Sequence, residues 1–234
     1  MNRVAALARV ELILLLRNKT AASMALVMPL VLGVVFAFLR NGDDWLAPIT
    51  TQLLVVQALT VYVSTTTALV ARRQDLSLKR LRSGEAAEPV ILAGVLAPMV
   101  LLGLVQGTVL VGIALVAGAP MPADLVAMAA AIVCGTLVAA GAGLATSAVT
   151  ATPETAQITT APLVAAMLFG AMWVLSTAAP SPLRLAAPGA ATAELVRAGM
   201  EGSRSVLVPI AVLAGWTVAT VLLGLRYFRW EPRS

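Results

Sequence analysis

The sequence predicts an all-α polytopic membrane protein with six transmembrane helices, preceded by a helix that lies on the membrane surface. Hydrophobic residues make up 60% of the chain and charged residues only 12%, whereas soluble proteins average roughly 45 to 50% and about 25%. The charged residues also fall at positions that leave six long uncharged stretches. Both observations indicate a chain that resides in a lipid bilayer.

The uncharged stretches locate the spans, because a charged side chain at the bilayer centre costs at least about 2.5 kcal/mol. Each stretch can hold the roughly 20 apolar residues that cross a hydrocarbon core as a helix. The expected transmembrane helices are 20–39, 46–71, 89–117, 125–149, 156–179 and 205–226. The turn-forming "GAPMP" at 118–122 ends the third of them.

Residues 3–19 precede the first span and carry charges at intervals too short for a transmembrane helix. We expect this segment to form a helix at the cytoplasmic surface of the membrane. Pro29 is expected to kink the span that follows. No internal repeat or low-complexity linker divides the chain, so residues 1–234 are expected to form one membrane domain.

The segment 180–203 is the long connection on the side opposite the termini. Its "ATAELVRAGMEG" predicts a short helix with Leu195 and Val196 on one side and Glu194 and Arg197 on the other. We expect this external segment to lie at the outer rim and to dip into the membrane without crossing it.

Lys and Arg are distributed unequally between the two sides that six spans create, and the richer side is usually cytoplasmic. Twelve lie on the side that holds both termini and the segment 72–88, whereas Arg40, Arg184, Arg197 and Arg204 lie on the other. Both termini are therefore expected in the cytoplasm. Since the basic residues flank the spans, anionic lipid accounts for the net charge of +5, and nucleic-acid binding is not expected.

Several kinds of chemistry are missing from the sequence. The chain contains no histidine, which removes zinc-peptidase motifs and most general bases that act near neutral pH. No predicted span holds an Asp or Glu, which a proton-coupled carrier ordinarily places at mid-depth, and there is no G-x-x-x-x-G-K-[ST] phosphate-binding loop. We therefore expect no catalysis, no metal site and no cofactor in this chain, and any ATP would be bound by another chain.

The cytoplasmic segment 72–88 combines basic residues with leucines. In a helix, Leu78 and Leu81 are neighbours at i and i+3, and the basic residues of "LKRLR" surround them. The pattern favours a short helix that inserts into a groove on a soluble partner. The alternative is that the basic residues only set the topology and bind anionic lipid, although topology alone does not require the leucines.

Polar side chains gather in the second, third and fifth predicted spans. The candidates for a translocation route are Gln57, Thr60, Tyr62, Ser64, Gln106, Gln157 and Thr160. Such groups face a partner helix or a cavity, because unpaired amides are costly in hydrocarbon. A route without fixed charge suits an amphipathic or lipophilic substrate, while hydrogen bonding between helices is the alternative for each single residue.

Four motifs in order along these spans resemble the permease subunit of type-2 ATP-binding cassette (ABC) exporters. "ARVELILLLRNKTAASMALVMPLVLGVVF" is similar to the elbow helix and first span of that family, with matches at Glu11, Arg17, Asn18 and Pro29. "LSLKRLR" resembles its coupling segment, although Leu76 stands where the family has a glycine and the proline after the motif is missing. "TPETA" resembles its turn after helix 4. The pattern before helix 6 is matched by Pro188, Thr192, Glu194, Leu195 and Arg197.

The resemblance implies the type-2 ABC exporter permease fold and assigns roles to individual residues. It implies an elbow with Glu11, Arg17 and Asn18. It implies coupling to an ATPase through Arg73, Asp75, Leu76, Leu78, Lys79, Arg80, Leu81 and Arg82. It also implies a dimer of permeases, of one or two kinds, with P-loop ATPase subunits that bind ATP and Mg²⁺.

The expected function is thus the transmembrane subunit of an exporter in the bacterial cytoplasmic membrane, moving a drug, a natural product or a lipid. An ion-coupled secondary carrier is one alternative. A noncatalytic membrane adaptor or immunity protein is the other, and it would leave the polar second span without an explanation.

Overall fold

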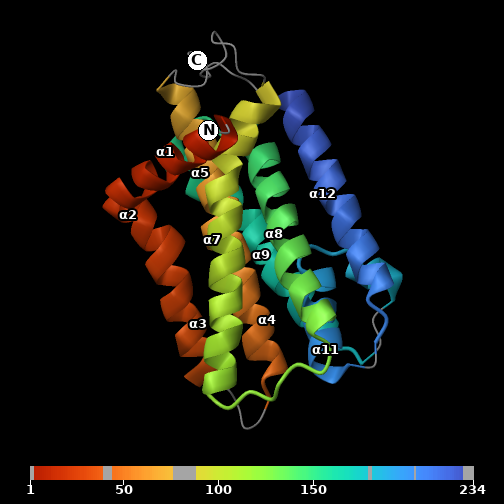
Figure 1. The fold of residues 1–234 in the computed structure, drawn as a ribbon. Helices are drawn as coiled ribbons and strands as arrows, with labels where there is room; N and C mark the ends of the chain where they lie inside the picture. Colours follow the sequence, from red (N-terminus) through yellow and green to blue (C-terminus); the bar gives the residue numbers. More distant parts are fainter. Residues whose placement is uncertain (1–2, 39–43, 76–87, 179–180, 203, 229–234) are drawn as a thin grey trace.

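The computed structural model describes residues 3–38, 44–75, 88–178, 181–202 and 204–228. These residues form helices joined by turns, and no strand occurs among them. Figure 1 shows the long helices side by side, with the start of α1 (Arg3–Arg17) and the end of α12 (Leu207–Tyr227) at the same end of the bundle. The predicted all-helical membrane fold is confirmed.

The helical runs lie close to the predicted spans. The first comprises α2 (Lys19–Ala22), η1 (Ser23–Val27) and α3 (Met28–Phe38), and the second comprises α4 (Leu46–Val55), η2 (Val56–Val63) and α5 (Ser64–Gln74). The others are α7 (Glu88–Val116), α8 (Leu125–Ser147), α9 (Pro153–Leu175) and α12. Among the described residues, five helical runs are long and apolar enough to cross a membrane, namely all of these except the first. The first run contains a shorter apolar helix, Ala25–Phe36.

Local sequence explains why the connections around α8 and α9 are short. Asp124 caps α8, because its Oδ1 accepts two backbone N–H groups at 2.8 and 3.0 Å. Thr152 and Thr155 form a capping box at the start of α9, with Pro153 in the first helical position. Gly118 turns the chain after α7 with a φ of 104°, a conformation that side chains disfavour.

Two spans contain π-helical turns, η1 and η2, and the first lies next to Pro29. Pro29 has no N–H to offer the carbonyl of Ala25, four residues earlier. Side chains from two other spans donate to that carbonyl instead, with Thr60 Oγ1 at 2.7 Å and Gln106 Nε2 at 3.0 Å. The Ala25 carbonyl, one turn before Pro29, therefore connects the first span to the second and third spans.

The central helix α8 packs against α12, η2, α5, α7 and α11. Small residues permit this close approach. A Cβ added to Gly143 would lie 2.9 Å from the carbonyl oxygen of Tyr62, and one added to Gly141 would lie 2.5 Å from Thr220 Oγ1. A Cβ on Gly103 of α7 would lie 2.3 Å from a side-chain carbon of η2. These glycines pack spans together within one chain.

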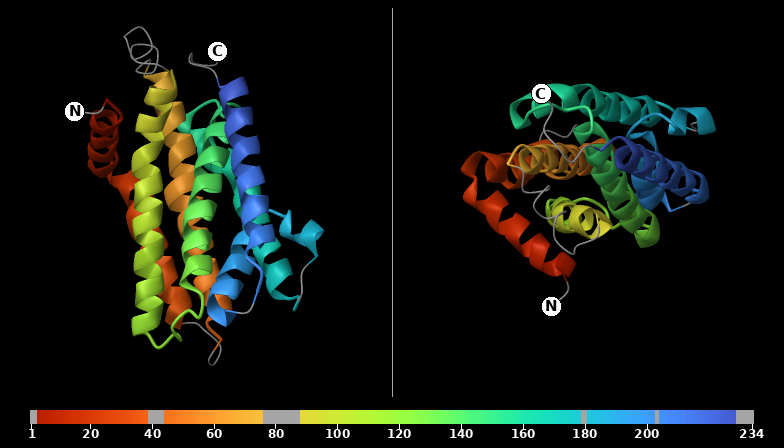
Figure 2. Two further views of the ribbon diagram at one scale, coloured as in Figure 1. Left: turned by 45° about the vertical axis from the view of Figure 1, so that its right-hand side comes forward. Right: turned by 90° about the horizontal axis from the view of Figure 1, so that it is seen from above.

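The helix α1 packs against α7 at the end of the bundle where the described part of α12 stops. Seen from above in Figure 2, α1 extends across the view beside the ends of the spans. Its Val10, Ile13 and Leu16 are exposed, together with Arg9 and Arg17. Apolar and basic side chains are thus exposed together along α1, and the position of this helix at the membrane surface stays a prediction.

The external segment contains α10 (Pro182–Leu185) and α11 (Ala190–Glu201). The helix α11 lies among α4, α8, α9 and α12, at the end of the bundle away from the termini (Figures 1 and 2). Residues 190–199 are all buried. The apolar and the charged side of α11 are therefore both buried within the bundle, and its charged residues need partners inside the protein.

Candidate functional site

A groove of about 540 Å³ lies at the end of the bundle that holds the start of α1. One wall is formed by the end of α1 and the start of α2, the other by α5, with contributions from α7 and α9. The lining residues are Leu14, Leu15, Arg17, Asn18, Thr20, Val63, Ser64, Thr67, Ala68, Ala71, Arg72, Asp75, Met99 and Gln157. Residues that the sequence placed in three separate sites, namely elbow, coupling segment and route, thus meet in one groove.

The lining of the groove is amphipathic. Leu14, Leu15 and Met99 provide apolar surface, whereas Ser64 and Gln157 provide hydroxyl and amide groups. Charged side chains from the end of α1 and the end of α5 also line it. A cavity with apolar walls and a few polar groups suits a molecule that is itself amphipathic.

One stripe of α5 supplies the long wall of the groove. Ser64, Thr67, Ala71 and Asp75 follow one another at intervals of three or four residues, so they share a helix face. Sequence reasoning selected Ser64 and Asp75 but missed Thr67, Ala71 and the adjacent Arg72. The helical spacing of small and polar residues was the signal that could have revealed them.

The elbow residues contribute unequally to the groove. Arg17 and Asn18 are exposed, and both line it. Glu11 lies within α1, and its side chain is outside the part that the structure describes. The elbow helix therefore forms a groove wall through its last turn.

The predicted coupling segment lies mostly outside the described residues. This applies to Leu76, Leu78, Lys79, Arg80, Leu81 and Arg82. Asp75 is exposed, follows the last residue of α5 and lines the groove. In the sequence, the stretch 76–87 thus follows directly after a residue that lines the groove.

Arg73 was predicted to couple to the ATPase alongside its neighbours, but its side chain is completely buried. Its guanidinium donates to the carbonyl oxygens of Ser147, at 3.0 Å, and Thr150. These carbonyls belong to the end of α8 and the turn after it. In this structure Arg73 therefore contacts other helices of the chain and is not available to touch a soluble partner directly.

Only two of the seven route candidates line the groove, namely Ser64 and Gln157. The Ser64 hydroxyl donates to the carbonyl of Leu59, at 2.9 Å, within its own helical run. Gln157 is exposed on α9.

The other route candidates form hydrogen bonds inside the bundle, as in the alternative that the sequence left open for each single residue. Gln57 Nε2 donates to the carbonyl of Ala131 in α8 at 3.1 Å. Thr60 Oγ1 lies 2.6 Å from Gln106 Oε1, and Gln106 also bonds to Ala25 in the first span. The physical reason is that buried amides and hydroxyls need partners, and neighbouring helices supply them.

Tyr62 and Thr160 are also hydrogen-bonded inside the bundle, Tyr62 to another helix and Thr160 within its own helix. The Tyr62 hydroxyl lies 3.0 Å from Thr146 Oγ1 of α8. Thr160 is buried and donates to the carbonyl of Ala156, one turn earlier in α9, at 2.7 Å. Gln57, Thr60 and Tyr62 therefore connect the second span to the first, third and fourth spans, and the part of this span that lines the groove is mainly α5.

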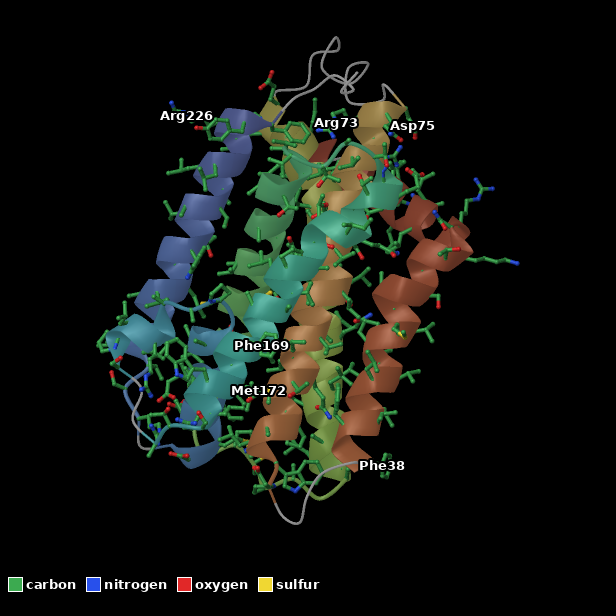
Figure 3. All side chains as sticks on the ribbon, turned by 180° about the vertical axis from the view of Figure 1, so that it is seen from behind. Phe38, Arg73, Asp75, Phe169, Met172 and Arg226 are labelled. Carbon is green, nitrogen blue, oxygen red and sulfur yellow. The ribbon has the colours of Figure 1, made fainter. Side chains whose placement is uncertain are left out.

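The helix α9 exposes a large apolar face. Ile158, Phe169, Met172 and Trp173 are all more than half exposed. Figure 3 shows Phe169 and Met172 pointing outward from α9. In a membrane, such a face contacts lipid or another protein chain.

At the opposite end of the bundle, α11 carries a buried charge network. Glu194 and Arg197 are 6% and 3% exposed and form an ion pair at 3.2 Å. Arg197 also donates to the carbonyls of Val174, Leu175 and Thr177, at 2.8 to 3.1 Å. The polar side of α11 is thus buried, and carbonyls in the last turn of α9 and just after it solvate the Arg197 guanidinium.

Arg204 connects this network to the surface. It bonds to Glu194 at 3.1 Å and to Glu201 at 2.6 Å. The hydrogen bond to Glu201 raises the pKa of the Arg204 guanidinium, so this cation remains charged under all ordinary conditions. Among the described residues, no cluster of three or more His, Cys, Asp or Glu side chains could hold a metal ion.

Comparisons with known proteins agree with this architecture. The family model described as ABC-2 type transporter matches residues 2–200, which extend from α1 through most of α11. No curated protein matched the chain. The matched region contains α1, the groove and most of the external segment. The chain therefore belongs to the ABC-2 type transporter family, whose members are transmembrane subunits of ABC transporters.

Proposed function

We propose that this chain is the transmembrane subunit of an ATP-driven exporter that moves an amphipathic or lipophilic substrate outward. The amphipathic groove between α1 and α5 is the observation that carries this proposal. The membrane is the bacterial cytoplasmic membrane, with both termini in the cytoplasm, as the distribution of Lys and Arg favours. The groove then opens at the depth of the inner leaflet.

The groove suits a drug, a natural product or a lipid better than a strongly hydrophilic solute. Leu14, Leu15 and Met99 can cover an apolar moiety, while Ser64 and Gln157 can hydrogen-bond a polar group. The surface helix α1 forms one wall, so a molecule that has partitioned into the membrane interface can reach the groove laterally.

Energy is supplied by a separate P-loop ATPase subunit, which binds ATP and Mg²⁺. The segment 76–87 contacts this subunit through its leucines and basic residues. Because the segment follows the end of α5 in the sequence, a displacement of the segment can reach Thr67 and Ala71 through the last turns of α5. Nucleotide binding can therefore change the shape of the groove.

A second permease chain, of the same or a different sequence, completes the transporter. The exposed apolar face of α9 supports this arrangement, because α9 also brings Gln157 to the groove. A partner packed along α9 would shield Phe169 and Met172 from lipid and enclose the route between two chains.

The first test is to purify the tagged chain from its native membrane and to identify stoichiometric partners by mass spectrometry. Co-purification of a P-loop ATPase, and ATP-dependent transport by the reconstituted complex, are the expected results. A chain that purifies without any nucleotide-binding partner, and that transports in response to an ion gradient, would instead establish a secondary carrier.

The groove itself is tested by filling it. Ala71→Phe places a large side chain in the groove, and we expect it to reduce ATP-dependent transport of a fluorescent amphipathic dye while the complex still assembles. Ala214→Phe on the exposed side of α12 is the matched control. Equal transport by the two variants would exclude the groove from the route.

A further inference from the structure

Arg73 occupies an unusual position for a charged residue at a membrane surface. It lies in the last turn of α5, yet its side chain is 0% exposed, whereas Gln74 and Asp75 beside it are exposed. Figure 3 shows Arg73 and Asp75 at the same end of the bundle. Burial of a permanent charge is unfavourable unless the charge is hydrogen-bonded, so the partners of Arg73 determine what it does.

The partners of Arg73 include two carbonyl groups, one at the last residue of α8 and one in the turn that follows it. Nη1 donates to Ser147, at 3.0 Å, and Nη2 donates to Thr150. The last carbonyls of a helix lack donors within the helix and lie at its negative end, where a cation is stabilised. The planar guanidinium can bond to two carbonyls at once, which fixes the orientation of one helix relative to the other in a way that a lysine would not.

The turn that Arg73 holds is itself tied to its surroundings. Thr150 Oγ1 lies 2.9 Å from Thr159 Oγ1 in α9 and donates to the carbonyl of Thr146 at 2.9 Å. Thr146 Oγ1 in turn contacts the Tyr62 hydroxyl at 3.0 Å. The last turn of α5, the last turn of α8 and the first turns of α9 therefore share one hydrogen-bonded network.

We propose that Arg73 is a positioning residue that fastens the last turn of α5 to the α8–α9 turn, so that both move as one body when the segment 76–87 is displaced. The proposal rests on the proposed ATP-driven function. It assigns to Arg73 the transmission of movement inside the permease, since its burial prevents it from meeting the ATPase directly.

The proposal determines how the groove changes shape. The wall made by α5 and the contribution of Gln157 from α9 lie on the moving body. The other wall belongs to α1, which packs against α7. ATP binding should therefore change the separation of α5 from α1, while the separation of α5 from the α8–α9 turn stays constant.

Distances between spin labels test this directly in the complete complex with its ATPase. With Cys134→Ala as background, labels at Gln74 and Ala151, both exposed, report on α5 and the turn. Labels at Gln74 and Leu16 report on the groove walls. We expect ATP to change only the second distance in the wild type, and to change both when Arg73→Met is introduced. A 74–151 distance that changes in the wild type would overturn the proposal.

Transport provides the second measurement. Because Arg73 does not contact nucleotide, we expect Arg73→Met to keep basal ATP hydrolysis while transport per ATP hydrolysed falls about tenfold, the ratio that loss of about 1.4 kcal/mol of coupling would produce. Arg73→Lys should restore part of the loss, since it keeps the charge but not the two-point contact. The control Arg226→Met removes an exposed arginine at the same end of the bundle and should change nothing.

The ratio of transport to hydrolysis separates positioning from folding. A variant that merely folded poorly would lose transport and ATP hydrolysis together, so the ratio of the two would stay unchanged. If Arg73→Lys lost both activities at an unchanged ratio, the proposal would be overturned. Wild-type complex that neither hydrolyses ATP nor transports with it would refute the proposed function, and the role of Arg73 with it. Normal coupling by Arg73→Met in an active complex would refute the role of Arg73 alone.

Discussion

The buried arginine of α11 gives a quantitative prediction about stability. Arg197 is 3% exposed, and replacing it by Met removes its bonds to the carbonyls of Val174, Leu175 and Thr177 and to the carboxylate of Glu194. Met has a similar length and no charge, so the packing of α11 is largely kept. The change therefore isolates the polar contacts that join α11 to the end of α9.

The expected cost follows from these contacts. Removing one partner of a buried ion pair costs about 3–5 kcal/mol, because the other charge stays buried. Glu194 keeps a second partner in Arg204, at 3.1 Å, so we expect a value near the lower limit, about 3 kcal/mol. At roughly 2–4 °C per kcal/mol for a chain of this length, the unfolding temperature should fall by about 6–12 °C.

The matched variant is Arg204→Met. The Arg204 side chain is 25% exposed and its bonds to Glu194 and Glu201 are partly hydrated, so its removal should cost only about 0–1 kcal/mol. Thermal unfolding in detergent, followed by the fluorescence of the native tryptophans, measures both variants. Equal unfolding temperatures for Arg197→Met and Arg204→Met would refute the claim that burial sets the strength of these contacts.

Two further predictions concern other parts of the chain. Leu78→Asp or Arg80→Glu should leave membrane insertion intact but abolish ATP-dependent transport, and normal transport by either variant would show that the segment 76–87 does not dock on the ATPase. Gly143→Ala should destabilise the protein by about 1–3 kcal/mol, because the added Cβ would lie 2.9 Å from a backbone carbonyl oxygen of η2. Gly215 has open space around it. The control Gly215→Ala should therefore be neutral or stabilise the protein by up to about 1 kcal/mol. Unfolding temperatures of the two glycine variants decide the matter, and a more stable Gly143→Ala would contradict the packing described for α8.

The all-helical fold with its long apolar helices could be predicted because hydrocarbon penalises charge whatever the neighbours are. The partners of the polar residues inside the spans could not. Gln57 and Thr60 pair with backbone carbonyls, and every residue has a carbonyl, so the sequence contains no record of which ones are accessible. A choice between a translocation route and interhelical bonding needs three-dimensional contacts.

The same limit applies to the charged residues. The sequence treated Arg73 as one of a basic cluster, although its acceptors lie 74 and 77 residues further along the chain. Glu194 and Arg197 were expected on the side of the helix opposite Leu195 and Val196, but both sides are buried. A periodic pattern shows which residues share a face but not which face is buried. The groove was partly visible, since Ser64 and Asp75 lie on one stripe of a helix, but its other wall comes from α1.

The helix α9 is held at both ends by arginines from other elements. Arg73 holds the turn that precedes it, and Arg197 holds the carbonyls at its end. A rod fixed at both ends cannot pivot and can only bow. Pro162 interrupts the backbone hydrogen bonds near the middle of α9, so bending should concentrate there. The exposed apolar face of α9 would then change its curvature during each transport cycle, and a partner chain that packs along it would follow the same motion.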